Sequence, residues 1–176
     1  FGGVQGIDPT GRFVYSIEGS ATGIAHYSID PVTFALTRQS TPQAAGARPQ
    51  VVAIDPAARF VHVLSNGAQG APDTISSFRA DLITGALTLA NPGVELGSRG
   101  ATSMAMHPSG RFLLVANSAA DTLSLYSVDR DSGIVSKSGA DIAAGDGPLH
   151  VVFDPSGTLA YVTNAFGDTL SRYAFD

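Results

Sequence analysis

The sequence has no cysteine, and only 14% of its 176 residues are charged. The absence of cysteine excludes thiol catalysis and removes the usual indicator of an oxidising or reducing compartment. Ordinary domains carry about 25% charged residues. This chain must therefore be stabilised mainly by hydrogen-bonded turns and by burial of its hydrophobic residues, which make up 44% of it.

Two classes of partner lack support in the composition. The ten Lys and Arg residues are scattered along a chain of net charge −5 and pI near 5.1, whereas a nucleic-acid-binding surface normally gathers basic residues into a stripe. No apolar run approaches the ~18 residues that a membrane-spanning helix needs. We therefore predict no nucleic-acid partner and no membrane span. No signal peptide is recognisable, but the chain begins at Phe1, so a cytoplasmic and an exported location both stay open.

No segment shows sustained helical spacing of apolar residues, and the sequence is organised instead by an internal repeat. A six-residue turn motif occurs four times, at intervals of 47, 52 and 47 residues. Its copies occupy residues 8–13, 55–60, 107–112 and 154–159. A period of roughly 40–50 residues with several short strands in each unit is typical of a β-propeller.

Each unit carries the same order of short apolar runs. One run precedes the turn, as in 151–153, and a second follows it, as in 159–162. A third is built on the pattern Thr-x-Ser-x-aromatic, as in 122–126, and a fourth follows a Thr-Gly or Ser-Gly turn, as in 87–89. Such runs predict strands, so each unit is expected to be a four-stranded antiparallel blade. The first two runs are almost continuously apolar, as expected for strands buried on both faces between blades.

The predicted fold is a single all-β domain, a β-propeller segment of about three and three-quarter blades. The blades span residues 1–47, 48–99, 100–146 and 147–176, and the last lacks its outer strand. The second blade is longer because a Gly/Pro loop, 67–72, separates its second and third strands. These units do not obviously close a ring, and an open array leaves an interface exposed. We expect the remaining blades from a longer chain, the favoured interpretation, or from a second copy.

Three motifs of the last unit carry a family resemblance. Gly-Pro-Leu-His at 147–150, Asp-Pro-Ser-Gly at 154–157 and Tyr-Val-Thr-Asn at 161–164 resemble the YVTN-type repeat of the lactonase-family β-propellers, which include 6-phosphogluconolactonase and carboxymuconate cyclase. The resemblance extends over the whole chain. It implies a seven-bladed propeller, about half of which this chain would supply, with the first strand of each blade nearest the central channel.

The resemblance also implies a site of basic and acidic residues at the channel mouth. The family's enzymes read Gly-Pro-Arg-His on a first strand and Asn-Glu after a second strand. Here His150 matches the His, whereas Leu149 replaces the Arg and Asn164-Ala165 replaces Asn-Glu.

Opening a sugar lactone requires a water beside a general base and donors for the developing oxyanion. His150 and Glu18 are the catalytic candidates, because each departs from its counterparts in the other units. Those counterparts are Val4, Val51 and Ser103 for His150, and Ser65, Asn117 and Asn164 for Glu18. A satisfied interior histidine and a solvated loop glutamate are the structural alternatives.

Four further residues are candidates for binding substrate. Arg48 and Arg99 precede first strands, where they could face an anionic ligand. Asn117 and Asn164 end second strands and could donate to a substrate, although asparagine there more often caps its own turn. No cluster of His, Asp and Glu has metal-ligand spacing and no Gly-rich phosphate loop is present, so we predict no metal and no cofactor.

The remaining histidines and the recurrent aspartates are interpreted as structural. His107 replaces the Asp of the repeated turn, His62 occupies a core position, and His26 lies in a third strand. The aspartates that recur at the exit of the third strand, which we interpret as turn residues, are Asp30, Asp81, Asp129 and Asp176.

Two functions stay open. The first, implied by the resemblance, is His-assisted hydrolysis of a sugar lactone such as 6-phosphogluconolactone. The second is a non-catalytic propeller that binds a protein or a glycan through its rim or channel mouth. The second is motivated by the replaced Arg and Glu of the enzyme pattern.

Overall fold

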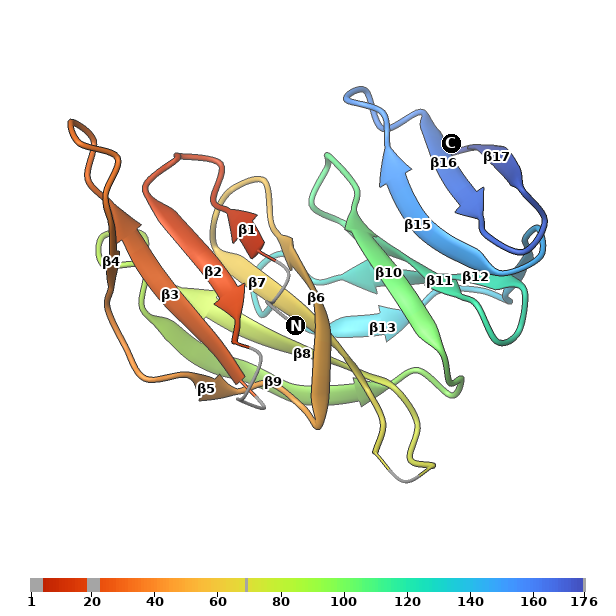
Figure 1. The fold of residues 1–176 in the computed structure, drawn as a ribbon, viewed down its shortest axis with the longest axis horizontal. Helices are drawn as coiled ribbons and strands as arrows, with labels where there is room; N and C mark the ends of the chain where they lie inside the picture. Colours follow the sequence, from red (N-terminus) through yellow and green to blue (C-terminus); the bar gives the residue numbers. More distant parts are fainter. Residues whose placement is uncertain (1–4, 19–22, 69, 176) are drawn as a thin grey trace.

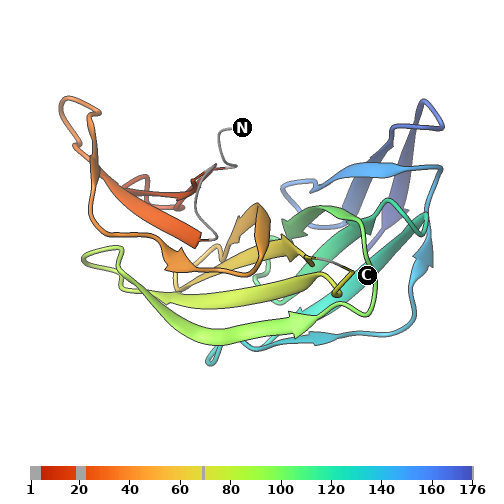
Figure 2. The same cartoon turned by 60° about the horizontal axis from the view of Figure 1, so that its bottom comes forward.

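The computed structural model describes residues 5–18, 23–68 and 70–175. Every regular element among these residues is a β-strand, and the strands form four antiparallel sheets. The sheets stand side by side from the N-terminal one, in red and orange, to the C-terminal one, in blue (Figure 1). Figure 2 shows the first and last sheets at opposite ends of an open arc. The all-β propeller architecture predicted from the repeat is confirmed.

The strands follow the repeat. The first sheet contains β1 (Gln5–Ile7), β2 (Phe13–Ile17), β3 (Gly23–Ile29), β4 (Leu36–Arg38) and β5 (Gln43–Ala44). The second contains β6 (Arg48–Ile54), β7 (Phe60–Asn66), β8 (Thr74–Ala80) and β9 (Leu87–Glu95). The third contains β10 (Ala101–Met106), β11 (Phe112–Asn117), β12 (Thr122–Val128), β13 (Val135–Lys137) and β14 (Ile142–Ala143). The fourth contains β15 (Pro148–Phe153), β16 (Leu159–Asn164) and β17 (Thr169–Ala174).

Consecutive strands pair within each sheet, but the outer strand is interrupted in two of the sheets. In the first and third sheets it is split, and both halves pair with the third strand of that sheet. The chain leaves the ladder near Pro42, which has no N–H to donate, and near Gly139, whose φ is 77°. The fourth sheet has three strands among the residues described. Val4 and Asp176, which the repeat placed in a first strand and at a third-strand exit, lie outside those residues.

Apolar cores lie between neighbouring sheets. Adjacent first strands contact one another, which places them on the inner side of the arc. Alternate residues of one strand enter different cores: Ala53 of β6 belongs to the core shared with the third sheet, whereas Val52 and Ile54 pack against the core shared with the first. Because both faces of these strands are covered, their sequences need not alternate between apolar and polar residues.

The repeated Pro turn is held by its first side chain. The Asp8 carboxylate accepts hydrogen bonds from the backbone N–H of Arg12 at 2.8 Å and of Phe13 at 2.7 Å. Burial raises the pKa of Asp8, but hydrogen bonds from Thr10, Phe13 and Arg12 more than offset it, so the pKa lies below its usual value. This carboxylate therefore explains why the turn begins with Asp.

His107 occupies the Asp position in the third blade and holds the turn through the N–H two residues further on. Its Nδ1 accepts from the backbone N–H of Ser109 at 3.0 Å, and its Nε2 lies 2.9 Å from the carbonyl oxygen of Gly157. The ring stacks on Phe175, with 4.7 Å between centroids. His107 is a turn residue, as predicted, and it also bridges the third and fourth blades.

The turn after each third strand is built on aspartate. The carboxylates of Asp30, Asp81 and Asp129 accept from backbone N–H groups two and three residues further on, at 2.7–3.1 Å. Hydrogen bonds from this turn hold the pKa of all three below the usual value. Their prediction as turn residues is confirmed.

A glycine in this outer turn fits against the preceding blade. Gly85 and Gly133 both have φ of 73°. A Cβ atom at Gly85 would lie 2.5 Å from the Phe13 ring, and one at Gly133 would lie 2.4 Å from the Phe60 ring. Glycine is thus required at both positions, because the backbone has a positive φ and because a phenylalanine ring of the preceding blade lies too close for a side chain. In the first blade Phe34, with φ of 57° and 75% exposed, occupies this position.

Candidate functional site

Five of the six candidate residues lie at one end of the sheets, opposite the Pro turns. Antiparallel pairing brings the end of a second strand beside the start of a first strand. Asn117 pairs with Ala101, and Asn164 pairs with Pro148. The five residues gathered at this end are Glu18, Arg48, Arg99, Asn117 and Asn164.

Asn117 is fully buried and satisfied within the protein. Its Nδ2 donates to Ser124 Oγ at 2.8 Å and to Thr122 Oγ1 at 3.3 Å, and its Oδ1 accepts from Ser98 Oγ at 3.1 Å. The side chain thereby ties the second strand of the blade to the third. Its role in substrate binding stays a prediction.

Asn164 repeats this arrangement with one bond fewer. Its Nδ2 donates to Ser171 Oγ at 2.9 Å and to Thr169 Oγ1 at 3.0 Å. Its Oδ1 is buried without a hydrogen-bond partner among the described residues. Gly145 precedes Asn164 by the same number of residues as Ser98 precedes Asn117, so the hydroxyl that Asn117 uses is missing here.

The Glu18 carboxylate faces the outer part of its own blade. Oε1 accepts from the Tyr27 hydroxyl at 2.7 Å, and Oε2 forms an ion pair with Arg38 at 2.9 Å. The hydrogen bond to Glu18 raises the pKa of Tyr27. These contacts are to β3 and β4, and none of the other five candidates contacts this carboxylate among the hydrogen bonds of the described residues.

Arg48 and Arg99 converge on the Gly/Pro loop of the second blade. Arg48 donates from its guanidinium to the carbonyl oxygen of Gly67. The Arg99 guanidinium lies 3.5 Å from the point that a Cβ atom on Gly70 would occupy. Both side chains are exposed, so two positive charges border this loop at the candidate end of the sheets.

His150 lies on β15, and its side chain is exposed. Its backbone N–H donates to Thr163 Oγ1 at 3.2 Å. Side chains two residues apart on a strand share a face, so His150 lies on the same face as Val152, which is 56% exposed. This is the face turned away from the third blade, because Val151 packs in the core between the third and fourth blades.

The other histidines are poorly placed to act on a solvent-exposed substrate. Burial lowers the pKa of His62 to about 4 and also lowers the pKa of His26. His62 is 0% exposed and His26 is 4% exposed. Within the described ranges no three His, Asp or Glu side chains gather as a metal site, and no helix is long and apolar enough to cross a membrane.

An aspartate precedes the third strand in the second, third and fourth blades, and its role was not predicted from the sequence. Asp73 accepts from the backbone N–H of Ala101 at 2.8 Å, and Asp121 accepts from that of Gly147 at 2.8 Å, in each case on the next blade. Asp168 occupies the same position in the fourth blade and is exposed. The signal was present as an Asp-Thr dipeptide that recurs in phase at 73–74, 121–122 and 168–169.

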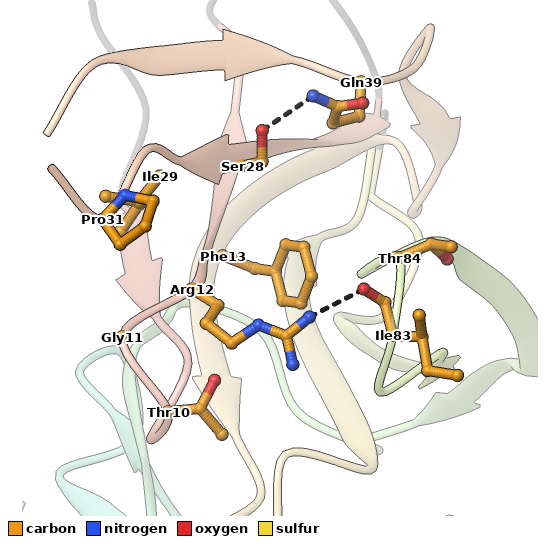
Figure 3. A pocket seen from close by; sticks show the side chains of 10 residues that line it. All are labelled: Thr10, Gly11, Arg12, Phe13, Ser28, Ile29, Pro31, Gln39, Ile83 and Thr84. Carbon is orange, nitrogen blue, oxygen red and sulfur yellow. Dashed lines mark hydrogen bonds between the residues drawn. The ribbon is translucent and has the colours of Figure 1, made fainter. Parts of the chain in front are cut away.

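A separate hollow of about 560 Å³ lies at the Pro-turn end of the first and second blades (Figure 3). Arg12 crosses it and donates to the carbonyl oxygen of Ile83 at 2.8 Å, and Gln39 donates to Ser28 Oγ at 2.7 Å. Thr10 and Thr84 add hydroxyls to its wall. None of the six predicted site residues lines this hollow.

A family model for the lactonase, seven-bladed β-propeller, matches residues 6–103 and 102–176. The chain belongs to this lactonase propeller family. The matched segments account for nearly all of the sequence, and they agree with the resemblance seen in its YVTN-type motifs. No curated protein matches the sequence.

Solved structures show the same fold at low sequence identity. A candidate 6-phosphogluconolactonase from Bacteroides uniformis aligns with 99% of this chain at 16% identity and a TM-score of 0.85, over 50% of its own length. A second candidate 6-phosphogluconolactonase, from Bacteroides fragilis, aligns with 99% at 21% identity and a TM-score of 0.82, over 51% of its length. The periplasmic gluconolactonase of Pseudomonas aeruginosa aligns with 98% at 20% identity and a TM-score of 0.70, over 42% of its length. The chain thus spans about half the length of the first two of these proteins.

Proposed function

We propose that this chain forms half of a lactonase-type propeller that hydrolyses a sugar lactone, such as 6-phosphogluconolactone. The observation that carries the proposal is the lactonase family match along both halves of the chain. His150 matches the histidine of the family's Gly-Pro-Arg-His pattern, whereas His26 and His62 are buried, so we choose His150 as the base. The other blades of the propeller come from a longer chain or a second copy.

In this proposal His150 accepts a proton from a water molecule as the water oxygen attacks the lactone carbonyl carbon. The bond between that carbon and the ring oxygen then breaks. The proton returns from the imidazole to the ring oxygen, which becomes a hydroxyl, and the product is the open sugar acid. An imidazole is suited to both steps because its ordinary pKa lies near neutral pH.

Glu18 and the substrate-binding candidates have distinct roles. Arg48 and Arg99 would attract the anionic group of a phosphorylated or acidic sugar, since guanidinium groups recognise phosphate and carboxylate well. Glu18, held by Tyr27 and Arg38, would act on the reacting centre only after leaving these partners. Asn117 and Asn164 would support the site by fixing the strand ends.

The test is lactone hydrolysis by the protein and by His150→Gln, corrected for spontaneous ring opening. We expect kcat to fall about 10²–10⁴-fold, the usual contribution of a general base. His107→Asp is the matched control, because it restores the residue of the other Pro turns and should keep activity. If the unaltered protein does not accelerate ring opening, or if His150→Gln is as active as it, the proposal fails.

A second function, binding of a glycan or protein through the rim, is favoured by the hollow at the Pro-turn end. Arg12, Ser28 and Gln39 present donors and acceptors there beside the Phe13 ring, a combination that suits sugar recognition. Gln39→Ala should then weaken glycan binding while His150→Gln leaves it unchanged. A glycan array on the two variants separates this function from lactone hydrolysis.

A further inference from the structure

Asn66 and Gly67, at the end of β7, form the dipeptide in which asparagine most readily loses its side-chain amide. The sequence has four asparagines, and Asn66 is the one that glycine follows. Because glycine has no Cβ atom, its backbone nitrogen can approach the side-chain carbonyl carbon of the preceding asparagine with little steric hindrance. The other three asparagines are followed by proline, serine and alanine, so the reactive pair occurs once in the chain.

The fold requires both residues of this pair. Asn66 Nδ2 donates to the carbonyl oxygen of Ala101 at 2.9 Å, which joins the second blade to the third. A Cβ atom at Gly67 would overlap the carbonyl oxygen of Ala71, so the loop that follows β7 accepts only glycine there. Two separate structural requirements, a donor side chain at one position and no side chain at the next, thus create the chemical reactivity.

Deamidation of such a pair needs no enzyme. The backbone nitrogen of Gly67 gives its proton to hydroxide and attacks Cγ of Asn66. The bond between Cγ and Nδ2 breaks, and the amide nitrogen leaves as ammonia after taking a proton from water, which regenerates hydroxide and leaves a five-membered cyclic imide. Water then adds to either imide carbonyl, and the bond from that carbon to the ring nitrogen breaks. The products are an aspartate with the normal main chain and an isoaspartate, in which the main chain passes through the side chain.

Asp73 holds the attacking nitrogen in its unreactive form. The Gly67 N–H donates to Asp73 Oδ1 at 2.9 Å, and Asp73 is 2% exposed. Removal of this proton would place a negative nitrogen beside a carboxylate and break a charge-assisted hydrogen bond. Antiparallel pairing with Arg48 also holds Asn66 in an extended strand. The folded protein therefore restrains a reaction that the dipeptide favours.

We propose that Asn66 is a site of spontaneous modification to aspartate or isoaspartate, and that Asp73 limits its rate by retaining the Gly67 proton. The Asp73 carboxylate is fixed for this role, because its Oδ2 accepts from the backbone N–H of Ala101 at 2.8 Å. Both Asn66 and Asp73 thus bond to Ala101 on the third blade. Local opening of the seam between the second and third blades releases the amide and the nucleophile together, so the rate of modification reports how often this seam opens. The inference does not depend on lactone hydrolysis.

The modified residue weakens the seam in which it forms. An aspartate at position 66 has no N–H for the Ala101 carbonyl oxygen, so two acceptors face each other. An isoaspartate also lengthens the main chain by one carbon before Gly67, whose carbonyl oxygen accepts from Arg48. Deamidation therefore removes a bond between two blades and alters the surroundings of a candidate substrate-binding residue.

The first test follows deamidation by peptide mapping with mass spectrometry, during incubation at mildly alkaline pH. In the protein unfolded in urea, Asn66 should be modified faster than the other three asparagines. In the folded protein its rate should be at least about tenfold lower, since a charge-assisted hydrogen bond must be broken first. The proposal is overturned if another asparagine is modified first in urea, or if folding leaves the rate at Asn66 unchanged.

Two variants test the role of Asp73. Asp73→Ala should raise the deamidation rate of Asn66 in the folded protein at least about tenfold. Asp121→Ala is the matched control, because Asp121 makes the equivalent bond to the next blade, from the Gly147 N–H at 2.8 Å, whereas the Gly67 N–H bonds to Asp73. Equal rates at Asn66 in the two folded variants overturn the proposal. If Asp73→Ala does not fold, hydrogen exchange of the unaltered protein decides, because it removes the same proton. The Gly67 N–H must then exchange at least about tenfold more slowly in the folded protein than in urea.

Asn66→Asp reproduces one product and tests its consequence. Its Tm should fall by about 5 °C, because the bond to the Ala101 carbonyl oxygen is lost. Asn91→Asp is the matched control, since Asn91 Oδ1 accepts from the Gly93 N–H at 3.1 Å, a bond that a carboxylate keeps. Equal Tm values for the two variants overturn the proposed weakening of the seam.

Discussion

Asp121 and Gly147 join the third and fourth blades through one charged hydrogen bond, from the Gly147 backbone N–H to Asp121 Oδ1 at 2.8 Å. Asp73 makes the corresponding bond to Ala101 one blade earlier. The contact therefore belongs to the repeat, and it links blades at the end of the sheets where the site candidates gather. It also offers an internal comparison, because Asp168 is the same residue without a described blade beyond it.

Asp121→Ala should lower the free energy of unfolding by about 1–3 kcal/mol more than Asp168→Ala does, the usual loss when a buried N–H loses a charged acceptor. Both aspartates have positive φ, 51° and 48°, so the backbone cost of alanine is shared and cancels. Urea denaturation of the two variants provides the measurement. Equal losses would show that Asp121 acts only through its own turn.

Gly133→Ala should destabilise the protein by about 2–4 kcal/mol. The new Cβ would lie 2.4 Å from the Phe60 ring, and the residue would keep a positive φ. Gly139→Ala is the control, since φ at Gly139 is 77° and nothing lies within 4 Å of its added Cβ. That variant should lose only about 1 kcal/mol. Equal decreases in Tm for the two variants in thermal denaturation would contradict the tight fit of Gly133 against Phe60.

His62 should make stability depend on pH between its folded and unfolded pKa values. Burial lowers the pKa of His62 from 6.5 to about 4, so between these pH values the imidazole is protonated in the unfolded chain and neutral in the folded chain. Its contribution to stability is full above pH 6.5 and is lost as pH falls towards 4, by on the order of 3 kcal/mol. His62→Leu should flatten this part of the curve. The free energy of unfolding of both proteins is measured by denaturation from pH 7 to pH 4. If it falls equally with pH in both, the pH dependence arises from groups other than His62.

Arg99→Gln should raise KM about tenfold for a phosphorylated lactone and leave KM for an uncharged lactone unchanged, because only the first substrate uses the guanidinium charge. This expectation rests on the proposed hydrolysis. Arg130→Gln, at an exposed position in an outer turn, is the control for the change in net charge. An equal rise in KM for both substrates would point to a structural role for Arg99.

Much of the fold could be predicted because the first three strands of a blade occur four times in the repeat and the outer strand occurs three times. The Asp8 turn, the Thr-x-Ser-x-aromatic strands and the continuous apolar runs each have a direct physical counterpart in the structure. The split of the outer strands could not be predicted, since short exposed strands carry little apolar pattern. Their interruption depends on single residues such as Pro42 and Gly139.

The site was harder to predict because the sequence does not reveal side-chain direction. Glu18 differs from its counterparts in the repeat, but Tyr27 and Arg38 hold it towards the outer strands. Asn117 looked like a donor for substrate, yet its amide is already bonded within its blade. The interblade role of Asp73 and Asp121 was also hidden, because it depends on which backbone N–H the next blade brings near.

Phe34 has a consequence for any neighbour on the open side of the first blade. Gly85 and Gly133 meet a large aromatic ring with no side chain of their own, but Phe34 brings the ring itself to that place. Two rings cannot share the space that one ring and a hydrogen atom occupy elsewhere. A polypeptide that covers this side must therefore present a small residue at the position where the first and second blades present Phe13 and Phe60. The large and the small side chain are then exchanged between the two blades, and this junction differs from the other junctions of the propeller.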